Sequence, residues 1–174
     1  NNKELEIIIS ILFGKNNIDI RHFSDINYEI ITQICSQHLI LPSLFVNLKK
    51  KNYLKFTENN FQKYINEIYE LNKERNIILL KEVDQITEIF NDNNVEFVYM
   101  KGVANLISKI YYDKGERMIG DIDVITNPKD LNKSNELLKN IGYKIKNENI
   151  RSVFILSINF HCISFRKSRT LCRL

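Results

Sequence analysis

Hydrophobic positions recur at helical spacing through the first 92 residues of the chain. Residues three, four and seven positions apart share one face of a helix, so this spacing predicts helices that are buried on that face. Four helices are predicted. The first covers residues 1–13, and the second begins after a cap at Ser24 or Asp25. The third begins at Pro42, and the fourth runs from Thr57 to the polar break at residues 91–94. Their expected inward faces carry Leu5, Ile8, Ile9 and Leu12; Ile26, Ile30, Ile31 and Ile34; Leu44, Phe45 and Leu48; and Phe61, Tyr64, Ile65, Ile68, Leu79, Val83, Ile86 and Phe90.

From residue 93 the pattern changes to strands that alternate with helices. Residues 95–100 and 119–126 are short runs rich in β-forming residues, and each predicts a strand. One helix is predicted over residues 103–112, and another begins at Asn127-Pro128 and ends at Gly142. Further strands are expected over residues 143–146 and 153–160. This order predicts an α+β fold, with a helical N-terminal region over residues 1–92 and a small mixed-sheet core with flanking helices over residues 93–174.

The composition narrows the class of protein. The chain has 174 residues, of which 44% are hydrophobic and 26% are charged, and this balance is typical of a domain with a buried core. No apolar run approaches the ~18 residues that span a bilayer, so an integral membrane protein is excluded, and we expect no signal peptide. The three cysteines form neither a metal-ligand spacing nor an even-numbered disulfide framework, which favours a cytoplasmic location.

The net charge of +4 arises in the C-terminal tail. Residues 151–174 hold five Lys or Arg and no acid, which leaves 20 basic and 21 acidic residues in the first 150. The near-neutral body lacks the general basic excess that is typical of nucleic-acid-binding proteins. A truncated or diverged C-terminus and an ordinary basic extension both explain the tail, and the sequence does not choose between them.

Two acids form the first candidate site, in the sequence Gly120-Asp121-Ile122-Asp123-Val124. Because side chains alternate along a strand, Ile122 and Val124 are expected to face the core while Asp121 and Asp123 project from the opposite face. Two neighbouring carboxylates repel each other, and a bound divalent cation with oxygen ligands removes that repulsion. We therefore predict that Asp121 and Asp123 bind Mg²⁺. The alternative is a solvated strand face on which two acids cost little.

Two further candidates precede the acidic strand. Lys101-Gly102 lies between a predicted strand and a predicted helix, where glycine permits close approach of a ligand and a helix N-terminus favours phosphate. Arg117 follows at the end of a turn, and its guanidinium suits phosphate oxygens. The alternatives are an ordinary strand-to-helix turn and a surface arginine. Together with the acids, these residues indicate metal-assisted phosphoryl chemistry on a nucleotide.

A resemblance to a known family agrees with this prediction. The motifs Lys101-Gly102, Arg117, Gly120-Asp121-Ile122-Asp123 and Gly142-Tyr143 are similar to those of a bacterial nucleotidyltransferase-like family in the DNA polymerase β-type superfamily. The similarity is good over residues 95–143 and looser over the rest of the chain. It implies a nucleotidyltransferase fold, Mg²⁺ as cofactor, a nucleoside triphosphate such as ATP as substrate, and a hydroxyl acceptor of unknown identity.

The chain departs from the family pattern at two places. Val103 replaces the serine that usually follows the glycine of the first turn. The resemblance also implies a third acid on a later strand, shortly before a histidine. The tail offers Asn159-Phe160-His161 there, and no Asp or Glu follows Glu148. A degenerate nucleotidyltransferase fold that binds a nucleotide or a protein is therefore the main alternative to an enzyme. A nucleic-acid-modifying toxin or antitoxin component is a third, supported only by the basic tail.

Overall fold

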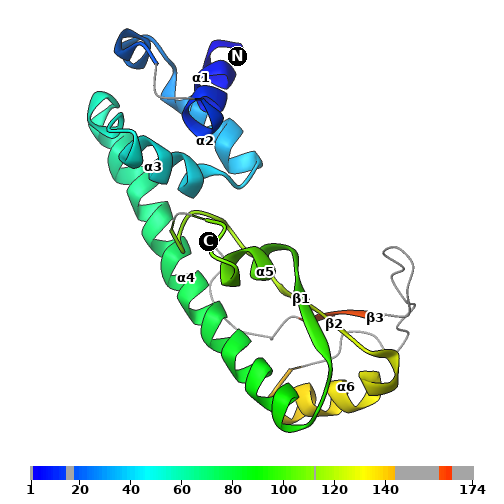
Figure 1. The fold of residues 1–174 in the computed structure, drawn as a ribbon. Helices are drawn as coiled ribbons and strands as arrows, with labels where there is room; N and C mark the ends of the chain where they lie inside the picture. The colour runs from blue at the N-terminus through cyan, green and yellow to red at the C-terminus, as the bar shows by residue number, and fades with distance from the viewer. Residues whose placement is uncertain (1, 15–17, 112, 144–160, 166–174) are drawn as a thin grey trace. The chain divides into compact units, whose positions relative to one another are not determined.

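The computed structural model describes residues 2–14, 18–111, 113–143 and, for the backbone only, 161–165 (Figure 1). The predicted strands over 143–146 and 153–160 lie almost wholly outside these residues. The α-helices are α1 (Asn2–Phe13), α2 (Tyr28–Gln37), α3 (Leu41–Lys50), α4 (Asn59–Asp92), α5 (Lys101–Ile107) and α6 (Leu131–Asn140). The short 3₁₀ helices are η1 (Ile20–Ser24), η2 (Leu54–Phe56) and η3 (Pro128–Asp130). The strands are β1 (Phe97–Met100), β2 (Ile122–Thr126) and β3 (His161–Phe165). The predicted α+β class is confirmed.

The chain forms two compact units, and α4 contributes residues to both. The N-terminal unit comprises Asn1–Ile77 together with Tyr111–Met118, and the C-terminal unit comprises Ile78–Ile110 and Ile119–Leu174. The boundary lies within α4 because the two halves of this helix bury their apolar residues in different cores. Phe61, Ile65 and Tyr69 belong to the first core, whereas Leu79, Val83, Ile86 and Phe90 belong to the second.

The helices of the N-terminal unit follow the predicted pattern with three corrections. Tyr64 of α4, which is predicted to face inward, is exposed. In α1 the buried residues are Ile7, Ile8 and Ile11, whereas Leu5 and Ile9 are exposed. The prediction is right for Ile8 and for Leu12, which packs against the core, and wrong for the two exposed residues. The reason is that α1 is apolar on several sides, and its packing against α2 and α3 selects the side that is buried. In α2 the cap is Asn27 instead of Ser24 or Asp25. Its side-chain oxygen accepts hydrogen bonds from the backbone N–H groups of Glu29 and Ile30.

The segment Tyr111–Met118 is held against α3 and α4 by side-chain donors of these helices. Asn72 and Asn76 are buried and lie one helical turn apart on α4. The Tyr69 hydroxyl donates a hydrogen bond of 2.8 Å to Asp113 Oδ1, and burial is the main reason that the pKa of Tyr69 is raised. Four successive carbonyl oxygens of the segment accept side-chain hydrogen bonds: Lys114 from Asn76 (2.6 Å), Gly115 from Asn72 (2.7 Å), Glu116 from Ser43 (2.8 Å), and Arg117 from both Asn72 (3.1 Å) and Asn76 (2.8 Å).

The C-terminal unit contains a three-stranded sheet in the order β1-β2-β3, and both strand pairs are antiparallel. The predicted mixed sheet is therefore wrong for the described strands. A strand–helix–strand order often gives parallel strands, because the helix carries the chain back to the starting edge. Here β2 begins beside the end of β1, with Met100 opposite Asp123, so the connection returns to the end of the sheet that it left.

The buried thiol of Cys35 gives a first testable prediction. Cys35 is a free cysteine in the core of the N-terminal unit, and burial raises its pKa to about 12. Since the thiolate is the reactive form, we expect iodoacetamide at pH 8 to alkylate Cys35 at least about 100-fold more slowly in the native protein than after unfolding. Peptide mass spectrometry that resolves Cys35 from Cys162 and Cys172 measures this ratio. Equal rates before and after unfolding would show that Cys35 is not buried in solution.

Candidate functional site

The antiparallel register brings the predicted Lys-Gly turn to the acidic strand within the C-terminal unit. Met100 is the last residue of β1 and pairs with Asp123 of β2. Lys101 follows Met100 directly and is the first residue of α5, so the predicted strand-to-helix position of Lys101-Gly102 is confirmed. Because α5 has only seven residues, its N-terminus alone does not form a phosphate site. The side chains therefore have to supply the chemistry.

An ion pair joins the two motifs. Lys101 Nζ lies 3.1 Å from Asp123 Oδ2, and the side chains are 55% and 5% exposed respectively. A carboxylate that is almost removed from water needs a nearby positive charge, since desolvation strongly disfavours an isolated ion. Lys101 provides that charge from a position that is still half in solvent. The pair thus combines a buried acid with an accessible cation.

The backbone of Lys101 is unusual for a residue with a side chain. Its φ angle is +53°, in the left-handed region that lysine rarely adopts. Such conformations cost free energy, and they cluster at binding and catalytic sites where the surrounding fold enforces them. Here the end of β1 and the start of α5 fix the conformation at the residue that pairs with Asp123.

The two acids differ in their surroundings. Ile122 and Val124 are buried in the core of the C-terminal unit, as the strand alternation predicts. Asp123 is also buried, so the alternative of a solvated strand face is wrong for this residue. Asp121 lies one residue before β2 and is partly exposed. One carboxylate is therefore held inside the fold, and the other lies where β2 begins.

The donor set of the two acids suits Mg²⁺ that arrives with a nucleotide. In the part of the chain whose side chains are described, no group of three or more His, Cys, Asp or Glu side chains is placed to hold a metal. Mg²⁺ does not need such a cage, since it commonly binds through one or two carboxylates, water and substrate phosphates. Asp121 and Asp123 are the residues that would hold it, and the buried Asp123 already requires a positive charge beside it.

The family resemblance implies a third acid on a later strand, and the described backbone of β3 shows which residues lie beside the acidic strand. The residue paired with Asp123 on β3 is Ser164, and His161 pairs with Thr126 at the opposite end of β2. No residue of β3 is an acid. A third carboxylate is thus not supplied by the strand next to the acidic pair.

Arg117 lies in the other unit of the chain. It belongs to the segment Tyr111–Met118 of the N-terminal unit, whereas Lys101, Gly102, Asp121 and Asp123 belong to the C-terminal unit. Its Nη1 donates a hydrogen bond of 2.8 Å to the Tyr111 hydroxyl, and its guanidinium lies 5.7 Å from the centre of that ring. The side chain is exposed. A role of Arg117 in phosphate binding stays a prediction from the sequence.

Sequence reasoning missed Asn72 and Asn76, which anchor the segment that precedes the acidic strand. The sequence of α4 does contain a signal for these two residues. Asparagine is a poor former of helix interiors, yet two asparagines stand four residues apart in the middle of a long helical pattern. Together with Tyr69 they occupy one face of α4. Polar residues that recur at helical spacing on a buried face indicate bonds to another segment of the backbone.

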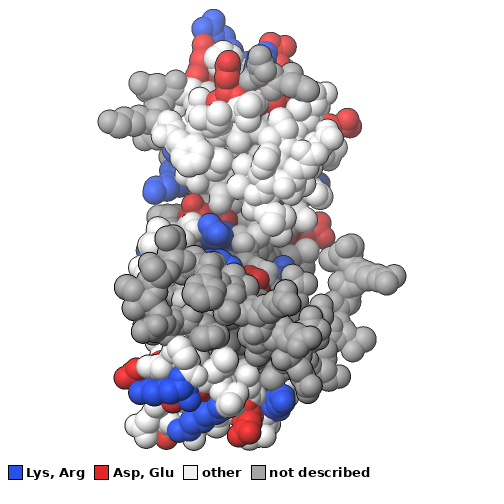
Figure 2. All heavy atoms as spheres, turned by 90° about the vertical axis from the view of Figure 1, so that its right-hand side faces the viewer, with Lys and Arg blue, Asp and Glu red and all other residues white. Residues whose placement is uncertain are grey.

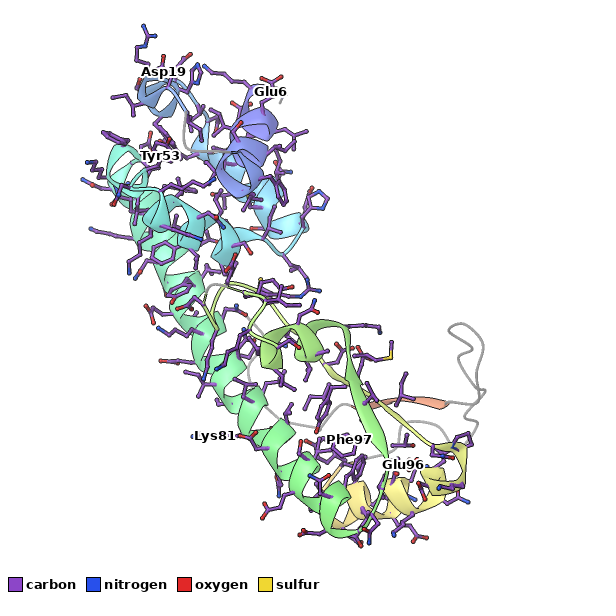
Figure 3. All side chains as sticks on the ribbon, in the orientation of Figure 1. Glu6, Asp19, Tyr53, Lys81, Glu96 and Phe97 are labelled. Atoms are coloured by element: carbon purple, nitrogen blue, oxygen red, sulfur yellow. The ribbon has the colours of Figure 1, made fainter. Side chains whose placement is uncertain are left out.

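Two other surface features of the described residues lie apart from the predicted site residues or lack their chemistry. A cavity of about 270 Å³ in the N-terminal unit is lined by residues that include Glu6 and Asp19 (Figure 3), and none of the predicted site residues lines it. Acidic and basic side chains are interspersed over the coloured part of the face in Figure 2. Clustered Lys and Arg are the mark of a nucleic-acid-binding surface, and this part of the face does not show it.

Comparison with models of protein families identifies the family of this chain. The model of a family described as "Uncharacterised nucleotidyltransferase" matches residues 17–169. The chain belongs to this family. The predicted nucleotidyltransferase-like family is confirmed by this match, and the five predicted site residues lie within the matched range. No curated protein and no solved structure matches the chain significantly. None of the described helices in this nucleotidyltransferase family member is long and apolar enough to cross a membrane.

Proposed function

We propose that this protein transfers a nucleoside monophosphate from a nucleoside triphosphate to a hydroxyl acceptor in a reaction that depends on Mg²⁺. The observation that carries the proposal is the buried Asp123, whose carboxylate is paired with Lys101 where β1 and β2 meet. Membership of a nucleotidyltransferase family supports the class of reaction.

Some of the site residues would bind the metal, and the others would bind the phosphates. Asp121 and Asp123 would hold Mg²⁺, which when bound neutralises phosphate charge and helps to orient the triphosphate. Lys101 would contact the phosphates, since its half-exposed side chain holds the ammonium beside Asp123. Gly102 directly after it would let a phosphate approach the backbone. These contacts favour transfer mainly by positioning and by fixed charge.

The proposed reaction conserves atoms and charge. The hydroxyl oxygen of the acceptor attacks the α-phosphorus and forms a new P–O bond. The bond between the α-phosphorus and the bridging oxygen breaks, and pyrophosphate leaves with the bonding electrons. The hydroxyl proton passes to water, since the described residues offer no third carboxylate beside the acidic pair.

Nucleotide binding is the direct test. With nucleotide at about 100 times its dissociation constant, mass action should stabilise the protein by about 2.7 kcal/mol. For a chain of this size this raises the midpoint of thermal unfolding by about 5–10 °C. We expect this shift with at least one of ATP, GTP, CTP and UTP in the presence of Mg²⁺, and we expect EDTA to remove it.

Two results would count against the proposed transfer reaction. No shift with any of the four nucleotides would contradict it. A Mg²⁺-dependent shift without release of pyrophosphate, measured across a panel of hydroxyl acceptors, would instead support the alternative of a nucleotide-binding module without catalysis.

A further inference from the structure

The sheet of the C-terminal unit has one face that packs against α4 and one that points away from it. Phe97 of β1 packs against the core of this unit, and the Tyr99 hydroxyl donates a hydrogen bond of 3.0 Å to the carbonyl oxygen of Val83 on α4. Because side chains alternate along a strand, Val98 and Met100 project from the opposite face. We call this second face, which points away from α4, the outer face of the sheet.

The strand register places apolar side chains beside Asp123 on the outer face. Met100 lies opposite Asp123, and Val98 lies opposite Ile125. Residues directly opposite each other on antiparallel strands project from the same face, with Cβ atoms about 4.5–5.5 Å apart. Val98 is 61% exposed, whereas Met100 and Ile125 are partly buried. The outer face of an antiparallel sheet usually carries polar side chains, so an apolar surface next to a charged residue indicates a binding site.

We propose that Val98, Met100 and Ile125 form a platform on which the nucleobase of the nucleoside triphosphate stacks. This inference rests on the proposed function, in which the triphosphate lies at Asp123, and it names a further part of the same substrate. Val98 lies about 7 Å beyond Met100 along the strand. The platform therefore begins beside the acid and extends away from it, as a base does that is separated from its phosphates by a ribose.

The side chains of the platform suit the face of a base and not its edge. Aliphatic groups pack against a flat ring by dispersion, and a methionine sulfur makes favourable contacts with aromatic rings. Val98 and Ile125 carry no hydrogen-bonding atom in their side chains, and the thioether of Met100 is only a weak acceptor. A site that does not read the base edge discriminates by contact area. Purines should thus bind more tightly than pyrimidines, while adenine and guanine should bind about equally.

The first test measures the affinity of the full chain for five ligands by calorimetry in the presence of Mg²⁺. The ligands are ATP, GTP, CTP, UTP and inorganic tripolyphosphate, which has no base. We expect the dissociation constants of ATP and GTP to agree within about threefold and to be at least about fivefold lower than those of CTP and UTP, because a second ring buries more apolar area.

The same panel separates failure of this inference from failure of the proposed function. If the protein binds all five ligands equally, the base makes no contact, and the inference is overturned with the triphosphate site intact. A strong preference for adenine over guanine would also overturn it, since the base edge would then be read. If none of the five ligands binds, both the proposed function and the inference are overturned.

Two substitutions of Val98 test the platform directly. Val98→Thr replaces an exposed methyl group by a hydroxyl group and keeps the β-branched shape, so the strand should be preserved. It should weaken the binding of ATP and GTP by about fourfold, as expected for loss of one apolar group from the contact. Val98→Phe adds a ring at an exposed position and should tighten the binding of ATP by about threefold. Neither variant should change the affinity for tripolyphosphate by more than about twofold, because this ligand does not reach the platform.

Ile110→Thr is the matched control, since it introduces the same residue at another position of this unit, where the side chain is 67% exposed. It should leave all five affinities unchanged. Equal losses for ATP and tripolyphosphate in Val98→Thr would assign the effect to the phosphates or to the fold and would overturn the inference. Unchanged ATP affinity in both Val98 variants would overturn it as well. If light scattering then shows that Val98→Thr changes the oligomeric state, a second copy of the chain covers the platform instead of a base.

Discussion

Asp123→Asn is expected to lower Mg²⁺-dependent nucleotidyl transfer by about 100-fold or more. Asparagine keeps the size of the side chain but removes the charge that holds the metal, and charge stabilisation by a metal is worth several kcal/mol of the barrier. The loss should appear in kcat/KM for release of pyrophosphate. It should also appear as loss of the Mg²⁺-dependent thermal shift with nucleotide. The fold should persist, because an amide in place of Asp123 removes the need for a buried counter-charge.

Glu96→Gln is the matched control for this variant. Glu96 is an exposed acid directly before β1, whereas Lys101 follows the opposite end of the same strand (Figure 3). We expect Glu96→Gln to leave kcat/KM within about twofold of the wild-type value, since isolated surface substitutions have small effects. Transfer that survives Asp123→Asn undiminished would remove Asp123 from the reaction. Equal losses in both variants would indicate a general effect of removing negative charge.

Asn76→Ala is expected to destabilise the protein by about 2 kcal/mol. Asn76 is fully buried, and its Nδ2 donates to the carbonyl oxygens of Lys114 (2.6 Å) and Arg117 (2.8 Å). Loss of one such hydrogen bond costs about 0.5–1.5 kcal/mol. Two such losses are partly offset, because Asn76 Oδ1 is itself buried without a hydrogen-bond partner among the described residues and disappears with the substitution. The midpoint of thermal unfolding should fall by about 4–8 °C.

Asn66→Ala provides the control on the same helix. Asn66 is exposed in the interior of α4, where alanine is the better helix former, so stability should stay the same or rise by up to about 0.7 kcal/mol. Limited proteolysis adds a local readout. Cleavage within Tyr111–Met118 should be faster in Asn76→Ala than in Asn66→Ala, because the segment loses donors on α4. Equal stability of the two variants would show that Asn76 does not hold this segment.

The hydrophobic spacing by itself was sufficient for the helices whose partners are ordinary apolar side chains. Val83, Ile86 and Phe90 are buried as their spacing on α4 predicts. Asn127 accepts a hydrogen bond from the backbone of Lys129, as expected of a cap before Pro128. Gly142 ends α6 with φ +92°, a conformation that glycine adopts readily. These features depend on local geometry, which a short stretch of sequence contains in full.

The sequence suggests the candidate site as a set of residues but not as an arrangement. Lys101, Asp121 and Asp123 are chosen because their residue types suit phosphate and metal, and their roles stay predictions. The number of residues between Lys101 and Asp123 in the sequence does not predict that their side chains form an ion pair. That contact exists because β1 and β2 are antiparallel with Met100 opposite Asp123. Strand direction depends on the path of the connecting segment, which no local pattern encodes.

The sequence by itself thus determined the α+β class, the identity of most helices and strands, and the chemistry available at Lys101 and the two acids. The tertiary structure decided which face of α1 is buried, where α4 is divided between two cores, and which side chains hold the segment before the acidic strand. The physical reason is that helix and turn formation are short-range and follow residue type and spacing. Burial, strand direction and ion pairing are long-range, because they depend on which distant segment supplies the other half of each contact.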